Sequence, residues 1–343
     1  MQLRIETQRS QVADELSALI AIARPVLRGL LYSLPAHRVQ RLGGVEQVTM
    51  EDLARERRES DGDCGVCFEY AVHEAVGRQD PMVVERVDYA LRRFCRIAGD
   101  DVSSILFGAE KQGSQRLIAT AKTLLTDESR LMYGTQGRPV HLRRHLDAAA
   151  AAFRTRGRGS RLPQSISGLW KADLFLGQAA PDKWVGTSVK INAAALEPAR
   201  GLRLGIVPAK GSDLIHKDER RNLIVVPLAW DEDFMDIFYA AWTAVVYVLA
   251  AGGGVPAQGL LHNPAHRRLA VLLAGHKETP VLGVIDALTP IAQPHLLEPQ
   301  ELSARLESPD VSGPAWHASV ETSTVIAPVP AQADAPAVRD TAD

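Results

Sequence analysis

The sequence has few cysteines, little net charge and no long apolar run. Only Cys64, Cys67 and Cys95 are cysteines among its 343 residues. This low, odd number argues against a disulfide-rich secreted scaffold and suits a reducing cytoplasm. The first residues, MQLRIETQRSQ, are polar and charged and contain no apolar signal-peptide region. We therefore expect a cytoplasmic protein.

Charge and hydropathy argue against two further classes of protein. The formal net charge is -2, which argues against coating nucleic acid through bulk positive charge but leaves a local basic groove open. The longest uncharged stretch, 237–261, has an apolar part of only about 14 residues before its glycines, short of the roughly 18 to 20 of a membrane span. We expect a buried core helix there. Walker, G-x-G-x-x-G, H-E-x-x-H and G-x-S-x-G motifs are also missing, so ATP, dinucleotide and serine-hydrolase chemistry have no local support.

Helical patterns come first along the chain and strand patterns follow. Hydrophobic residues make up 46% and charged residues 23%, a globular composition. We expect helices over 8–34 (with a possible break at Pro25), 64–78, 82–97, 113–126 and 141–154. A further helix is expected to start near Thr49. We expect strands over 169–176, 184–191, 202–207 and 222–228, then helices from 231 or 232 to about 250 and over 263–274. The chain is therefore predicted to be mixed α/β.

The first two predicted strands carry charged residues where a plain core strand would have none. Alternate side chains of a strand share a face, so Ser188 and Lys190 share a face of the second strand. Pairing through the turn GQAAPDK would bring Asp173 of the first strand to the same side. A carboxylate can hold a hard divalent cation, the cation can activate water and phosphate, and a lysine can offset developing charge. The pattern suits phosphodiester hydrolysis, although a solvated ion pair of Asp173 and Lys190 explains the same spacing.

This stretch resembles the PD-(D/E)XK nuclease superfamily, which has the restriction-endonuclease-like fold. Its pattern is an Asp, a turn and a strand ending in x-x-Lys, preceded by a helical Glu that often lies in G-x-x-F-E. In CGVCFEYAVHEAV, Gly65, Phe68 and Glu69 have that arrangement. The resemblance covers residues 62–228 and implies a mixed sheet flanked by helices.

The resemblance also implies an activity. It implies a Mg²⁺-dependent (or Mn²⁺-dependent) endonuclease, a hydrolase that cleaves DNA or another nucleic acid, in restriction or phage defence. Carried over by position, Asp173 is the central metal ligand, Glu69 an accessory ligand and Lys190 the catalytic lysine. The backbone carbonyl of Val189 could complete the metal shell. The implied partners are DNA and either a second copy of the chain or a partner subunit of a defence system.

Two residues depart from the family pattern. Ser188 stands where Asp or Glu is common, and serine is a poor Mg²⁺ ligand. Some restriction enzymes of this fold place a carboxylate on a later helix instead, and Glu197 is a candidate for that role. Ala172 stands where Pro often precedes the Asp. The serine keeps open an inactive nucleic-acid-binding or assembly module on the same fold, and a helical interaction protein with an incidental sheet is a third reading.

The expected boundaries follow from the resemblance and the composition. We expect an N-terminal helical region over 1–60 and a restriction-endonuclease-like core over 61–255 with a helical insertion over 80–155. A C-terminal helical region is expected over 256–306. The last part, 307–343, is rich in Pro, Ala, Ser, Thr and Asp and is expected to be disordered.

Residues near Glu69 have weaker claims to function. Cys64 and Cys67 have the spacing of half a zinc site, but no second pair exists, so buried helix cysteines are expected. Glu74 lies about 140° round the helix from Glu69 and is expected to be solvated. His73 shares the face of Glu69 and is either a phosphate contact or a satisfied structural histidine.

Basic residues precede the first predicted strand. Arg154, Arg156, Arg158 and Arg161 lie in RTRGRGSR, where a flexible backbone and guanidinium groups suit phosphate contacts. A plain solvated linker is the other reading. We also expect Asn192, after the second strand, to contact nucleic acid.

Overall fold

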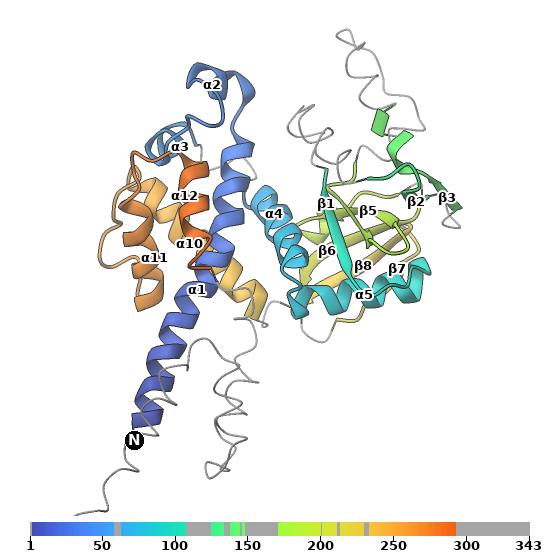
Figure 1. Ribbon diagram of the computed structural model, residues 1–343, viewed down its shortest axis with the longest axis horizontal. Coiled ribbons are helices and arrows are strands. Elements are labelled where there is room, and N and C mark those ends of the chain that lie inside the picture. Colours follow the sequence, from blue (N-terminus) through green and yellow to red (C-terminus); the bar gives the residue numbers. More distant parts are fainter. Residues whose placement is uncertain are drawn as a thin grey trace, which may run out of the picture.

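A curled mixed sheet flanked by helices forms the centre of the fold (Figure 1). The computed structural model describes residues 2–57, 63–107, 125–133, 138–144, 146–147, 171–199, 201–210, 213–229 and 233–292. The mixed sheet with its flanking helices confirms the predicted α/β class.

The strands follow one path with a hairpin beside it. Along the path the order is β1 (Val102–Leu106), β4 (Leu174–Gln178), β5 (Lys183–Val189), β6 (Arg203–Ala209), β8 (Leu223–Ala229) and β7 (His216–Asp218). The neighbours β5–β6 and β6–β8 are parallel, and the other neighbours on the path are antiparallel. The hairpin consists of β2 (Arg130–Tyr133) and β3 (Arg138–His141), and β2 pairs with β5. The four predicted strands correspond to β4, β5, β6 and β8.

The strands β6 and β8 are buried along almost their whole length. Parallel strands covered on both faces are usually continuously apolar, which explains the runs RLGIVPA and LIVVPLA. One face contributes Leu204 and Ile206 to the main core. On the other face Leu196 packs with Val207 and Val225. The segment that follows β5 therefore covers the second face of the sheet.

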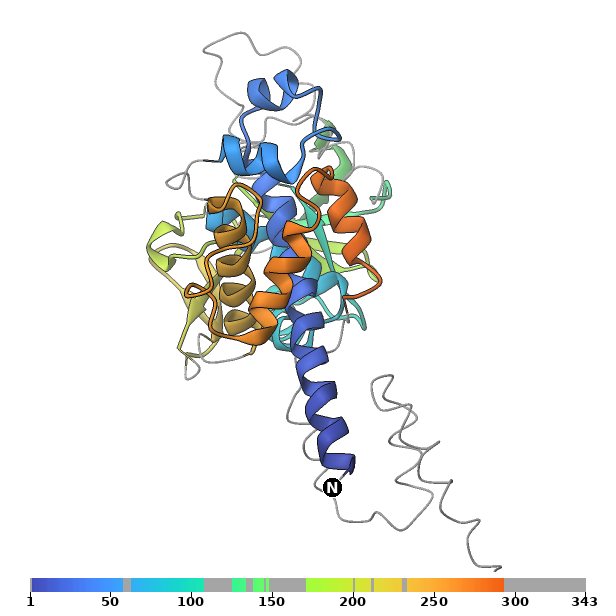
Figure 2. The same ribbon diagram turned by 90° about the vertical axis from the view of Figure 1, so that its left-hand side faces the viewer.

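Helices pack mainly on one side of the sheet and extend away from it (Figures 1 and 2). They are α1 (Gln2–Ser33), α2 (Ala36–Arg41), α3 (Met50–Glu56), α4 (Asp63–Gly77), α5 (Pro81–Cys95), α10 (Asp233–Ala250), α11 (Pro264–Ala274) and α12 (Val281–Leu288), with the short 3-10 helix η1 (Ala193–Ala195). The predicted helix near Thr49 is confirmed as α3, and Thr49 and Asp52 form a reciprocal capping box at its start.

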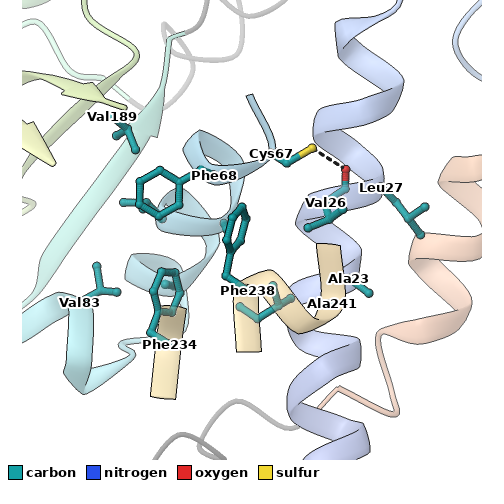
Figure 3. Packing of buried hydrophobic residues seen from close by; sticks show 14 of the residues in the cluster. Ala23, Val26, Leu27, Cys67, Phe68, Val83, Val189, Phe234, Phe238 and Ala241 are labelled. Carbon is teal, nitrogen blue, oxygen red and sulfur yellow. Dashed lines mark hydrogen bonds between the residues drawn. The ribbon is translucent and has the colours of Figure 1, made fainter. Parts of the chain in front are cut away.

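The helix α4 lies between α1 and the sheet (Figure 1). Its Phe68 packs edge-on against Phe238 of α10, with ring centroids 5.3 Å apart. Figure 3 shows Phe68 between α10 and Val189 of β5 in one continuous core. The helices and the sheet thus share a single hydrophobic core, and α4 is its central element.

The apolar helices α1 and α10 were compared with the length that a membrane span requires. The stretch 237–261 contributes most of α10, whose Phe238, Ala241 and Val245 are fully buried, so the prediction of a core helix there is confirmed. Within the described ranges one stretch, Glu15–Ser33 of α1, is long and apolar enough to cross a membrane, but 67% of its most apolar window is buried inside the protein. This burial fits a core helix.

Some sequence expectations differ from the structure. Pro25 lies inside α1 and does not end it. The region 80–155, expected to be a helical insertion, contains α5 but also β1, β2 and β3. Pairing with β4 determines the short β1, VSSIL, because strand preference depends on neighbouring strands more than on local sequence. Within the predicted helix 113–126 only 125–126 are described, and they are not helical.

Other expectations concern parts of the chain outside the described residues. These include the arginines 154, 156, 158 and 161, residues 148–154 of the last predicted N-terminal helix, and the tail 307–343.

The close packing of α1 and α4 depends on Gly29. A Cβ atom at this position would lie 2.7 Å from the Cα of Cys67 and 2.9 Å from its sulfur. The Cys67 thiol donates a hydrogen bond to the carbonyl of Val26 at 3.2 Å (Figure 3). Backbone atoms of the two helices therefore approach more closely than any side chain at position 29 would allow.

We expect Gly29→Ala to lower the free energy of unfolding by about 1 to 3 kcal/mol, because the added methyl group must push the helices apart. Urea denaturation measures this change. Gly65→Ala on α4 is the matched control, since a Cβ there meets nothing within 4 Å; it should be neutral or stabilising by up to about 1 kcal/mol. Equal losses in both variants would contradict the packing argument.

Candidate active site

Three charged side chains from separate elements meet at one end of the β4–β5 hairpin. The ammonium nitrogen of Lys190 lies 2.6 Å from Oδ2 of Asp173 and 3.2 Å from Oε1 of Glu69. Asp173 directly precedes β4, Lys190 directly follows β5, and Glu69 lies on α4. These are the three residues that the sequence pattern selects. Because both carboxylate oxygens contact one nitrogen atom, they lie within about 6 Å of each other, close enough for the two carboxylates to share one metal ion.

Strand pairing holds Asp173 in place. The register of the hairpin pairs Leu174 with Thr187, and the amide of Asp173 donates to the carbonyl of Thr187 at 2.8 Å. The carbonyl of Asp173 accepts from the amide of Phe107 at 2.9 Å, next to β1. Its carboxylate oxygen Oδ2 also accepts from the amide of Val189 at 2.9 Å. The carboxylate is therefore oriented by backbone groups as well as by Lys190.

Packing on both sides of α4 positions Glu69. The neighbouring residue Phe68 is fully buried against α10 and β5, and Cys67 is hydrogen-bonded to α1. Glu69 itself is 3% exposed. A carboxylate at such a buried position needs a partner of opposite charge, and Lys190 provides it.

The electrostatics of the site keep Lys190 positively charged. Burial alone would lower the pKa of Lys190, but Asp173 and Glu69 outweigh burial and raise it above the ordinary value of 10.5. A raised lysine pKa means that the stabilisation from the ammonium is present below pH 10.5 and is lost only above the raised pKa. Lys190 therefore acts as a fixed cation at neutral pH and is not a proton acceptor.

The residues around the three charged groups have mainly structural contacts. The buried Ser188 donates a hydrogen bond to the carbonyl of Lys171 at 3.4 Å. Glu197, the candidate for a relocated acid, forms an ion pair with the side chain of Lys171 instead of joining Asp173. The exposed Asn192 caps η1, since its Oδ1 accepts from the amide of Ala194 at 2.9 Å. Ser188 and Glu197 therefore do not supply a third carboxylate next to Asp173.

Sequence reasoning missed two features of this site. The amide of Val189 binds Asp173, whereas the sequence suggested a role for the carbonyl of Val189. A backbone contact of this kind leaves no signal in residue types. The Lys171–Glu197 ion pair could be anticipated in part, because strand alternation places the side chain of Lys171 on the same face as that of Asp173.

The donor atoms at the site suit a hard cation. In the part of the chain that the structure describes, no group of three or more His, Cys, Asp or Glu side chains is placed to hold a metal ion. Glu69 and Asp173 provide two carboxylates. Magnesium in proteins is commonly held by one or two carboxylates, with water and substrate phosphate completing its shell. The pair fits Mg²⁺ or Mn²⁺ and does not fit a structural zinc site, which needs four protein ligands.

The other polar residues of α4 are partnered within the fold. Glu74 was expected to be solvated, which is wrong: it pairs with Arg28 at 2.6 Å and with Arg24 at 3.8 Å. The arginines belong to α1, which passes over this side of α4. The Nδ1 atom of His73 lies 2.9 Å from Oγ of Ser104 on β1, which supports the structural reading of His73.

The cysteines follow the expectation of buried helix residues. Cys64, Cys67 and Cys95 are free, and Cys67 and Cys95 are buried. Burial, followed by the nearby carboxylate of Asp63, raises the pKa of Cys64 to about 11. Burial also raises the pKa of Cys67 and of Cys95. All three thiols are therefore protonated at neutral pH and are poor metal ligands.

Comparisons with protein-family models, curated proteins and solved structures find no match to this chain. The function must therefore be inferred from the geometry of Glu69, Asp173 and Lys190.

The environment of His73 predicts acid-sensitive stability. Burial and the nearby guanidinium of Arg28 lower the pKa of His73 from 6.5 to about 4. Between these values the unfolded chain binds a proton that the folded chain does not, so the free energy of unfolding falls as pH drops from 6.5 to 4, by up to about 3 kcal/mol.

We expect His73→Gln, which does not titrate and retains a polar group near Ser104, to flatten this part of the pH dependence. Urea denaturation at several pH values between 7 and 4.5 measures the slopes. Identical slopes in the parent protein and the variant would rule out His73 as the titrating group.

Proposed function

We propose that this protein is a metal-dependent endonuclease that hydrolyses DNA phosphodiester bonds on a restriction-endonuclease-like fold. One observation carries the proposal. Glu69, Asp173 and Lys190, which match the family pattern in the sequence, meet with contacts of 2.6 and 3.2 Å. They do so across a separation of 121 positions between Glu69 and Lys190. Their order along the chain, a helix followed by two sheet segments, is also that of the pattern.

Burial distinguishes this group from an ordinary surface ion pair. The side chains of Glu69 and Asp173 are 3% and 7% exposed, and that of Lys190 is 24% exposed. Buried ion pairs often add no stability relative to apolar residues of the same volume. Charged groups buried at one end of a sheet, with a shifted pKa, are typical of functional sites. This supports a chemical role for the three residues.

The residues of the site have separable roles. When bound at Asp173 and Glu69, a divalent cation supplies an activated water and polarises the phosphate. Asp173 is the rigid ligand, since the amide of Val189 and the strand ladder orient it. Glu69 binds directly or through water, and the Val189 carbonyl is a further candidate ligand. Lys190 brings a permanent positive charge toward the phosphate oxygens, where negative charge grows during attack.

Basic residues near the site in the sequence favour a nucleic-acid substrate. The arginine-rich segment 154–161 shortly precedes Lys171 in the sequence, and arginine clusters suit phosphate backbones. A role in restriction or phage defence follows only from the family resemblance. Cleavage of both strands would favour a two-fold dimer or a partner subunit.

A cleavage assay tests the proposal. We expect metal-dependent nicking of plasmid DNA in Mg²⁺ or Mn²⁺ that EDTA abolishes. Asp173→Asn and Lys190→Ala should each lower the rate by about 100-fold or more, because each removes a group that stabilises the transition state. The matched controls are Asp286→Asn on the exposed side of α12 and Lys277→Ala, whose side chain pairs with Glu51.

Both controls should cleave at the parental rate. Full activity of Asp173→Asn and Lys190→Ala would refute the assigned site, and the catalytic residues of the nuclease would then lie elsewhere. Absence of cleavage by the parent protein under any divalent metal would refute the nuclease itself.

The second candidate function is a non-catalytic module that binds nucleic acid on the same fold. Ser188 favours it, because its hydroxyl contacts the Lys171 carbonyl in place of a third carboxylate. This reading predicts DNA binding that weakens steeply with salt, survives Asp173→Asn, and is accompanied by no cleavage under any divalent metal. Fluorescence anisotropy with labelled duplex DNA at two salt concentrations measures binding. Cleavage lost in Asp173→Asn would exclude this second reading.

A further inference from the structure

We infer that Lys190 and a divalent cation compete for the same two carboxylates, so that metal binding displaces the Lys190 ammonium from Asp173 and Glu69. The inference rests on the proposed metal-dependent function and concerns how that site is loaded. It comes from one geometric fact: a single nitrogen atom contacts one oxygen of each carboxylate, at 2.6 and 3.2 Å.

The ammonium already performs the electrostatic task of a bound cation. The two carboxylates are almost fully buried and come from different elements of the fold. Without a positive charge between them they would repel each other in a medium of low polarity. Lys190 supplies that charge, which allows the site to fold without metal.

A divalent cation and the ammonium cannot both stay in this position. Metal–oxygen distances are roughly 2.0 to 2.6 Å for Mg²⁺ and Ca²⁺, so a cation held by both carboxylates would lie about where the Lys190 nitrogen lies. Like charges at such short separation repel strongly. The two cations therefore bind in competition.

The displaced lysine has an open direction in which to move. Its side chain is 24% exposed, whereas those of its two partners are 3% and 7% exposed. The following residues 192–195 are also exposed. A released ammonium would therefore move toward solvent, where the phosphate of a substrate would approach. Metal loading would then free the lysine for the phosphate, and the metal-free site would hold it inactive.

Direct Mn²⁺ binding tests this competition without DNA and without turnover. The signal of free Mn²⁺ in electron paramagnetic resonance gives the dissociation constant. We expect Lys190→Gln to bind Mn²⁺ at least about fivefold more tightly than the parent protein, the low end of typical coupling between ligands. Lys190→Arg, which retains the charge, should show no such gain. Asp173→Asn should lose binding, and Lys277→Gln, away from the site, should bind as the parent does.

A stability measurement controls for the folding of the variant. Lys190→Gln removes the ammonium that contacts both buried carboxylates, so this variant will melt at a lower temperature in EDTA than the parent protein. A ligand that binds the folded state raises the melting temperature. If Mn²⁺ replaces the missing charge, saturating Mn²⁺ will raise the melting temperature of Lys190→Gln by more than that of the parent.

The outcomes separate this inference from the proposed function. Equal or weaker Mn²⁺ binding by Lys190→Gln, with metal-dependent cleavage by the parent, would overturn the competition and leave the nuclease standing. Tighter binding by Lys190→Gln, with no cleavage by the parent, would uphold the competition and remove the nuclease. No Mn²⁺ binding by any variant, together with no cleavage, would overturn both.

Discussion

The sharing of one ammonium group by two buried carboxylates is the constraint on which the arrangement of this protein depends. Lys190 reaches the buried Glu69 on α4 because β5 ends beside that helix. Asp173 must then enter from the adjacent strand, which the antiparallel register of β4 and β5 ensures. The hairpin, the central helix and the charges therefore form one unit, because a displacement of any one part would leave a charge buried without its partner.

The helix α4 connects this charged unit to the rest of the molecule. Its contacts with α1 include the thiol of Cys67 and the ion pair of Glu74 with Arg28. Phe68 joins it to α10 and the sheet (Figure 3). Helices that appear remote from the site in Figure 1 therefore help to set its geometry. A protein that needs a carboxylate held rigidly gains from such support, because loosely held groups bind and catalyse poorly.

The sequence predicted that Glu69, Asp173 and Lys190 would lie together, and the structure brings them into contact. It predicted the contacts of the surrounding residues less well. Alternation along the strands placed Asp173 and Lys190 on one side, because local periodicity decides which face a side chain occupies. Glu69 was selected only through the family resemblance of the phrase around Phe68. The partner of Glu74 and the pairing of Glu197 with Lys171 were not predicted, since both depend on where distant segments pack. The edge strand β1 was missed for the same reason. Its five residues have little strand character of their own, and β4 provides the pairing.

The contact of Phe68 with α10 has a consequence for the timing of assembly. Phe238 lies well after Lys190 in the chain, yet it packs against the residue that precedes Glu69. During synthesis from the N-terminus, Glu69, Asp173 and Lys190 all leave the ribosome before Phe238 does. The nascent chain thus carries the three charged residues before it has the aromatic ring that supports α4 from the side opposite the sheet. The charged group is therefore fully supported only late in translation, when α10 has been added.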